Sequence, residues 1–310
     1  MNAWPRLDYK ADCGTIETIH LLLQQIGKLP VRLHPWINHG WHVALRITPR
    51  GAVTRPLPAG ERHITVELDF HEGAIVVACD SGGRKGLLVA GKTIAQVHRE
   101  LADLLAQFGL PAPLYGMPNE LPDPMPFAED ERPREWDGDA ARRLHGAFLR
   151  ADRAFNAFRS LYRGKTSPSH LFWGSLDLAV TRFSGRDAPM HPGGVPHLPD
   201  AVTREAYSHE VISAGFWPGG GGFDEAAFYA YAYPTPNGLA ERPVEPAGAQ
   251  WNGQLGEFLL PYATVREADD PDALVQQFLQ STFVAAAELL DWPHDLVIGP
   301  APSYGSPPAA

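Results

Sequence analysis

The sequence contains little cysteine and no long apolar run, and each shortage narrows the class of protein that it can encode. Only two cysteines, Cys13 and Cys79, occur among 310 residues. They form no C-x-x-C pair, which argues against a disulfide framework and favours a reducing compartment. No segment approaches the roughly 18 to 20 consecutive apolar residues of a membrane span, and no secretory signal pattern opens the chain. We therefore expect a cytoplasmic protein without a membrane partner.

Positive charge is also scarce. The chain has 26 lysines and arginines against 36 aspartates and glutamates, and its formal net charge is -10. Because no basic cluster offsets this excess, a phosphate backbone would be repelled, and we expect no nucleic-acid partner. A small-molecule ligand remains the partner to consider, and the oligomeric state stays open.

Familiar catalytic motifs are missing as well. The sequence has no nucleophile elbow, no H-E-x-x-H and no G-x-G-x-x-G. Residues 86–93, GLLVAGKT, match the pattern of a phosphate-binding loop. The apolar LLVA is typical of a strand, however, and the flanking pattern indicates antiparallel strands instead of a β-α-β unit. We interpret the match as a strand followed by a capped helix.

The patterns that are present predict a mixed fold. Apolar spacing predicts helices over residues 15–26, 93–108, 139–162 and 271–291. Short β-rich segments fill residues 31–89, and further strands are predicted over 170–183, 206–216, 226–233 and 256–260. Seven prolines in residues 111–136 indicate an extended surface connector. This divides the chain into residues 1–110, the connector 111–136, residues 137–299 and a loose tail, 300–310.

The two halves resemble each other. In each half a helix ends at a Gly-Lys pair, Gly27-Lys28 or Gly164-Lys165, and a tryptophan, Trp36 or Trp173, follows eight residues after the lysine. We therefore predict an α+β protein of two similar halves, each an antiparallel β-sheet with helices on one face, consistent with an internal duplication. A ligand pocket would then lie between the halves.

Residues 170–222 carry the densest collection of ligand-binding and proton-transfer groups. Asp177, His209 and Glu210 are the candidate acid/base groups. Strand alternation groups aromatic and polar side chains on one sheet face, which is typical of a small-molecule pocket and equally of a packing seam between the halves. The candidate substrate-binding residues are Trp173, Ser175, Arg182, Tyr207, Trp217, Tyr229 and Tyr231.

Histidines in the same region suggest a metal site. His191 and His197 precede His209 and Glu210, and imidazoles with one carboxylate can bind a divalent zinc or iron ion. The spacing matches no established metal motif, and neighbours on a strand point to opposite faces. Histidines that serve as hydrogen-bonding groups are therefore the alternative, and the cofactor stays undefined.

The strings FWGSLDLAVTRFSGR and HPGGVPHLPDAVTREAYSHE, with WPRLDY near the N-terminus, carry a resemblance to a known group. They resemble a family of bacterial proteins known as a domain of unknown function, and the resemblance covers nearly the whole chain. It implies no activity or cofactor. Two hypotheses follow from the residues. One is a small-molecule enzyme, acid/base or metal-assisted, with its pocket between the halves. The other is a non-catalytic small-molecule-binding or interaction protein that uses the same aromatic face.

Overall fold

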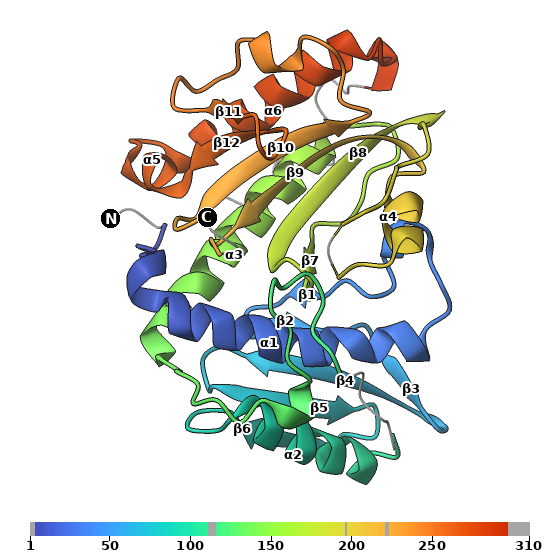
Figure 1. The fold of residues 1–310 in the computed structure, drawn as a ribbon, viewed down its shortest axis with the longest axis vertical. Helices are drawn as coiled ribbons and strands as arrows, with labels where there is room; N and C mark the ends of the chain where they lie inside the picture. Colours follow the sequence, from blue (N-terminus) through green and yellow to red (C-terminus); the bar gives the residue numbers. More distant parts are fainter. Residues whose placement is uncertain (1–3, 111–115, 196, 221–222, 297–310) are drawn as a thin grey trace, which may run out of the picture.

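The computed structural model describes residues 4–110, 116–195, 197–220 and 223–296 (Figure 1). The first half contains α1 (Tyr9–Leu33), η1 (Asn38–Gly40), β1 (Arg46–Ile47), β2 (Gly51–Val53), β3 (Leu57–Ala59), β4 (Arg62–Asp69), β5 (Ala74–Cys79), β6 (Arg84–Leu88) and α2 (Ile94–Gln107). The connector holds η2 (Phe127–Glu129). The predicted tail from residue 300 lies outside the described residues.

The second half has the same mixture of helices and strands. It contains α3 (Gly138–Ser160), β7 (His170–Phe172), β8 (Asp177–Asp187), α4 (Asp200–Ala206), β9 (His209–Trp217), β10 (Ala227–Tyr233), η3 (Leu239–Glu241), β11 (Gln250–Asn252), β12 (Glu257–Pro261), α5 (Tyr262–Glu267), α6 (Pro271–Leu289) and η4 (His294–Leu296).

The strands form two antiparallel sheets of six strands each. The first sheet has the order β1-β2-β4-β5-β6, with β3 paired to β4, and the second has the order β11-β12-β10-β9-β8-β7. The predicted α+β class with two sheet-based halves is therefore confirmed, whereas the internal duplication stays a prediction. Leu45 and Leu171 join the two halves, because each backbone N–H donates to the other residue's carbonyl at 2.9 and 2.8 Å.

Helix α1 crosses the middle of the molecule between the two sheets (Figure 1). The apolar stripe predicted over residues 15–26 is buried, with Ile19, Leu23 and Ile26 fully inaccessible. The helix is longer than predicted, since Asp8 caps its start and the expected strand at residues 31–33 continues it to Leu33. Val31 and Arg32 are exposed in this last turn, and the His34 N–H donates to the Pro30 carbonyl at 3.0 Å where the helix ends.

Helices α3 and α6 cover one face of the second sheet. Phenylalanine rings fill the space between α3 and the sheet. Phe155 of α3 meets Phe228 of β10 edge to face at 6.1 Å between ring centroids, and Phe148 meets Phe216 of β9 at 5.6 Å. All four rings are fully buried. The opposite face of this sheet is free of these helices, and it carries the candidate site.

One local prediction is wrong, and the difference shapes the site. The expected strand 170–183 is divided by a turn at residues 173–176, where Leu176 has φ +57°. The connector is less superficial than its prolines indicate, because Phe127 is fully buried and Asp130 is 1 % exposed. Arg132 and Arg134 both donate to the Asp130 carboxylate, and these ion pairs stabilise the buried charge.

Candidate functional site: an acidic and tyrosine-rich sheet face

One face of the second sheet carries polar and aromatic side chains. Tyr229 of β10 lies opposite Gly215 of β9, and Gly215 lies opposite Ala179 of β8. On the other side, Tyr229 lies opposite Leu259 of β12. Residues paired across antiparallel strands share a face, as do residues two apart along one strand. The face therefore holds Asp177, Ala179, Thr181, Ser213, Gly215, Tyr229, Tyr231, Glu257 and Leu259.

Gly215 allows the Tyr229 side chain to cross β9 and reach Asp177. A β-carbon at Gly215 would lie 2.2 Å from Cζ of the Tyr229 ring, so any larger residue would displace the ring. The Tyr229 hydroxyl donates to Oδ2 of Asp177, and Ser175 Oγ donates to Oδ1 at 2.9 Å. Asp177 is 9 % exposed. Each oxygen of this buried carboxylate therefore has a hydroxyl donor, as buried polar groups require.

Glu120 reaches the same place from the connector. Its φ is +57°, a left-handed conformation that is uncommon outside glycine and persists only where the surroundings hold it. The carboxylate lies against the backbone of Gly174, where a β-carbon would be 1.9 Å from Oε1. Leu176, in the turn before Asp177, also has φ +57°. Two strained backbone positions thus adjoin the buried carboxylate.

Asn119 fixes the connector at this position. Its backbone N–H donates to Oε1 of Gln24 at 2.7 Å, and Nε2 of Gln24 donates back to its carbonyl at 2.8 Å. Its side-chain Oδ1 accepts from Nζ of Lys28, and its Nδ2 donates to the His197 carbonyl at 3.0 Å. Helix α1 therefore positions Glu120 through its neighbour in the chain.

Lys28 is the cation beside these carboxylates. Only 8 % of Lys28 is exposed, and burial lowers its pKa to about 8, against the opposing effect of the Glu120 charge. Its ammonium lies 5.1 Å from the centre of the Trp173 ring, within the range of a cation–π contact. Trp173 is itself held by a hydrogen bond from Nε1 to the Val43 carbonyl at 3.0 Å.

Two half-buried glutamates have unusually high pKa values. Burial, with the nearby charge of Asp177, raises the pKa of Glu120 from 4.5 to about 7, while Ser175 and Lys28 oppose the rise. Burial and the same Asp177 charge raise the pKa of Glu257 from 4.5 to about 7. Carboxyl groups usually lose their protons near pH 4. These two can therefore both hold and release protons at neutral pH.

Asp177 and the tyrosines are also perturbed. Burial raises the pKa of Asp177, although the hydrogen bonds from Tyr229 and Ser175 favour its charged form. Burial and the Asp177 charge raise the pKa of Tyr229 well above its ordinary value. Tyr229 therefore stays protonated and serves as a hydrogen-bond donor, and we assign it no role as a base.

Tyr207 closes the face from the segment after α4. Its hydroxyl donates to the hydroxyl of Tyr231 at 3.0 Å, and its ring stacks on His191 at 4.9 Å between centroids. The rings of Tyr229 and Tyr231 lie 6.1 Å apart at an angle of 18°. We call the whole group the acidic–tyrosine cluster. It consists of Lys28, Glu120, Asp177, Tyr207, Tyr229, Tyr231 and Glu257.

Two of the three predicted acid/base residues, His209 and Glu210, contact residues outside this cluster. His209 Nε2 is 3.5 Å from Asp187 Oδ1, and its ring is 5.7 Å from that of His39. Glu210 accepts a hydrogen bond from Arg186 Nε at 2.9 Å. Asp177 alone belongs to the cluster, so the structure does not bring the three together.

The predicted substrate-binding residues also divide. Ser175, Tyr207, Tyr229 and Tyr231 adjoin or form the cluster. Arg182 is fully buried on the helix-covered face, 3.4 Å above the Phe158 ring, and it cannot contact a ligand on the other face. Trp217 lies at the end of β9, stacked on Phe223 at 5.5 Å.

The predicted metal ligands, His191 and His197, do not form a metal site in the structure. His191 Nδ1 accepts from the Gly193 N–H at 3.0 Å, and His197 is exposed. Across residues 4–296, leaving out the gaps in the description, no three His, Cys, Asp or Glu side chains are arranged to hold a metal ion. The donor set therefore does not fit zinc or iron at these residues, and we derive no chemistry through a metal.

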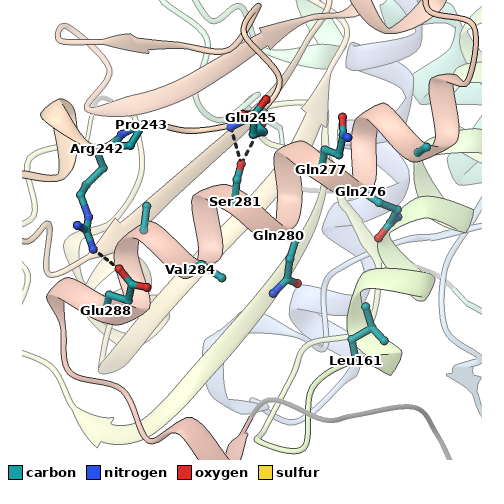
Figure 2. A pocket seen from close by; sticks show the side chains of 12 residues that line it. Leu161, Arg242, Pro243, Glu245, Gln276, Gln277, Gln280, Ser281, Val284 and Glu288 are labelled. Atoms are coloured by element: carbon teal, nitrogen blue, oxygen red, sulfur yellow. Dashed lines mark hydrogen bonds and ion pairs between the residues drawn. The ribbon is translucent and has the colours of Figure 1, made fainter.

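A groove lies elsewhere, on the outer side of α6 (Figure 2). It encloses about 710 Å³ and runs along α6 beside Leu161 and residues 242–245. Arg242 pairs with Glu288, and Ser281 exchanges hydrogen bonds with the backbone of Glu245. Since Arg242, the one cation of the lining, already pairs with Glu288, the groove offers less chemistry than the acidic–tyrosine cluster.

Sequence reasoning missed Lys28, Glu120 and Glu257. Lys28 comes from α1, Glu120 from the proline-rich connector and Glu257 from the start of β12, and no local pattern connects these three positions. The one available signal was the alternation of β12, which places Glu257 and Leu259 on the face opposite Phe258. The pocket predicted between the halves stays a prediction.

The fold and the cluster define an α+β protein with two antiparallel sheets and an acidic face on the second sheet. The chain belongs to the family of unknown function DUF5996, whose model matches residues 4–298. The comparisons found no matching curated protein and no matching solved structure. In the part of the chain that the structure describes, no helix is both long and apolar enough to cross a membrane.

Proposed function

We propose that this protein is an enzyme that acts on a small molecule by general acid–base catalysis at the acidic–tyrosine cluster. The observation that carries the proposal is the pair of half-buried glutamates, Glu120 and Glu257, whose pKa values are both raised to about 7 beside Asp177. Acid–base catalysis is most efficient when the pKa of the catalytic group is near the working pH. Strongly perturbed carboxyl groups gather at functional sites more often than elsewhere.

The surroundings favour a proton donor and a proton acceptor at one site. The charge of Asp177 disfavours the ionised forms of both Glu120 and Glu257, so either glutamate can be protonated near neutral pH. One glutamate can then remain protonated as the acid while the other is ionised as the base. The hydroxyl groups of Ser175 and Tyr229 hold the Asp177 carboxylate in place by hydrogen bonds.

The strained backbone is consistent with this role. Glu120 and Leu176 both have φ +57°, at a cost of roughly 1 to 3 kcal/mol each. Such strain concentrates at active sites and ligand clamps, where a fixed side-chain position justifies its cost. The hydrogen bonds of Asn119 to Gln24 and Lys28 supply the restraint at Glu120.

The experiment compares the wild-type protein with the Asp177→Asn variant in a mixture of small metabolites. Both proteins are incubated with a filtered cell extract, and the compounds consumed and formed are measured by mass spectrometry. We expect the wild-type protein to convert at least one compound that the variant leaves unchanged. Circular dichroism and a urea unfolding curve establish that both proteins are folded. Identical metabolite profiles from two folded proteins would overturn the enzyme proposal.

The alternative is a non-catalytic binding protein that uses the same face. The half-buried rings of Tyr207, Tyr229 and Tyr231 favour it, since aromatic surface with a few polar groups is typical of ligand sites in general. A compound that the wild-type protein retains unchanged through gel filtration, and that Asp177→Asn releases, would support this reading over the enzyme.

A further inference from the structure

The acidic–tyrosine cluster has more carboxyl groups than its own cations can neutralise. Lys28 is the one cation of the cluster; its charge acts on Glu120, and its ammonium already donates to Asn119. Asp177 is satisfied by neutral hydroxyls. Among the described residues, no hydrogen bond or ion pair reaches the carboxylate of Glu257. Glu257 is also half-buried and partly open to solvent, so a ligand can approach it.

A metal ion does not account for this excess. Within the described residues, the carboxylates do not converge in a group of three that could hold an ion. They come from three separate elements, the connector, β8 and β12. A cation that pairs with Glu257 alone needs no second or third carboxylate, and its remaining atoms can occupy the adjacent surface.

The adjacent surface is aromatic. The half-buried rings of Tyr229 and Tyr231 lie nearly parallel, 6.1 Å apart, beside Glu257 in the register of β10 and β12. Tyrosine ring faces attract cations as well as apolar groups. A carboxylate next to two tyrosine rings is suited to a positively charged group on an apolar body.

We propose, building on the proposed function, that the ligand of the acidic–tyrosine cluster is an organic cation, a primary ammonium or guanidinium carried on an apolar body, with Glu257 as its carboxylate partner. An anionic ligand would face uncompensated carboxylates. A neutral ligand would leave Glu257 without a charged partner.

The titratable groups around the site set the pH dependence of binding. They are Lys28 of α1, Glu120 of the connector, Asp177 of β8, Tyr207 after α4, Tyr229 and Tyr231 of β10, and Glu257 of β12. His20 of α1 adjoins them, because its Nε2 lies 2.8 Å from the carbonyl oxygen of Gly174. Since burial raises the pKa of Glu120 and Glu257 to about 7, a bound cation favours their ionised forms. Cation binding should therefore release protons and become tighter as the pH rises through 7.

The test uses three probes of nearly equal shape: benzylamine, benzyl alcohol and benzoate. Their affinities for the full-length protein are measured by titration calorimetry and ligand-observed NMR between about pH 5.5 and about pH 8, where benzylamine is a cation. We expect benzylamine to bind at least about tenfold more tightly than benzyl alcohol at pH 8, the equivalent of one charge-assisted hydrogen bond. Calorimetry in two buffers of different ionisation enthalpy reports the released protons.

The Glu257→Gln variant locates the interaction. The variant should bind benzylamine about tenfold more weakly than the wild-type protein does at pH 8. Its affinity for benzyl alcohol should stay within about twofold of the wild-type value. Glu61→Gln, a change in the exposed turn between β3 and β4, is the matched control and should alter neither affinity. Equal affinity for the amine and the alcohol, or an amine affinity that Glu257→Gln leaves unchanged, would overturn the inference.

This outcome is distinguishable from failure of the proposed function. If Asp177→Asn abolishes metabolite turnover while benzylamine shows no preference over the alcohol, the enzyme proposal stands and the organic-cation class is wrong. If benzylamine binds as expected while the two metabolite profiles are identical, the ligand class stands and catalysis is wrong.

Discussion

Replacing Glu257 by glutamine should stabilise the folded protein at neutral and alkaline pH. Burial raises the pKa of Glu257 from 4.5 to about 7, so the folded state resists ionisation of this group. Below pH 4.5 the carboxyl group is protonated in both the folded and the unfolded state, and it costs nothing. Between pH 4.5 and about 7 only the unfolded state ionises, so the free energy of unfolding falls as the pH rises. Above pH 7 the penalty is complete and constant.

The size of the effect follows from the same interval. A pKa raised from 4.5 to about 7 corresponds to at most about 3.4 kcal/mol. Glu257 is partly open to water and its titration is linked to that of Asp177, so we expect about 1 to 2 kcal/mol. Glutamine has nearly the same shape but cannot ionise. The gain in the free energy of unfolding caused by Glu257→Gln should therefore be about 1 to 2 kcal/mol larger at pH 8 than at pH 5.

Urea unfolding curves of the wild-type protein and Glu257→Gln at pH 5, 6, 7 and 8 measure this difference. Glu61→Gln, on an exposed turn, serves as the control and should change the free energy of unfolding by less than about 0.5 kcal/mol at every pH. The reasoning would be refuted if Glu257→Gln destabilised the protein at pH 8, or if its effect were independent of pH.

Three further changes test the packing on the two faces of the second sheet. Tyr229→Phe removes a hydroxyl donor to Asp177 and should lower the free energy of unfolding by about 1 to 2 kcal/mol in urea; an unchanged stability would contradict that hydrogen bond. Gly215→Ala places a β-carbon 2.2 Å from the Tyr229 ring, and it should cost roughly 1 to 3 kcal/mol and disturb the ring's NMR signals; Gly253→Ala, with no atom within 4 Å, is its control. Arg182→Met should be neutral or stabilising in a thermal melt, because the buried guanidinium, whose pKa burial lowers to about 9, has no carboxylate partner in the described part of the chain; a loss above about 2 kcal/mol would show that its cation–π contacts outweigh its desolvation.

Local patterns predicted much of the fold. The alternation in HITVELDF corresponds to β4, with Ile64, Val66 and Leu68 buried. The helix predicted from residue 93 is capped as expected, because Thr93 and Gln96 form a capping box at the start of α2. These features depend on neighbours in the chain, so sequence alone suffices. The extension of α1 to Leu33 was missed because Gly27 and Pro30 are residue types that usually end a helix, whereas here both lie inside it.

The candidate site divides in the same way. Alternation along single strands correctly grouped Tyr229 with Tyr231, because strand parity is a local property. The partnership of Asp177 with Glu120 and Lys28 is created by tertiary folding, which brings the connector and α1 against the second sheet. Parity also separates Arg182 from Asp177, a difference of five positions that puts them on opposite faces. Both residues lie on β8, so strand alternation alone separates them.

The central claim is that the acidic–tyrosine cluster can donate and accept protons at neutral pH, and a carboxyl NMR titration tests it most directly. Protein labelled with ¹³C at the glutamate side-chain carboxyl is titrated, and the signals of Glu120 and Glu257 are assigned by their absence in Glu120→Gln and Glu257→Gln. We predict that both signals move with midpoints near a pKa of about 7. Midpoints near the ordinary value of 4.5 for both residues would contradict the claim.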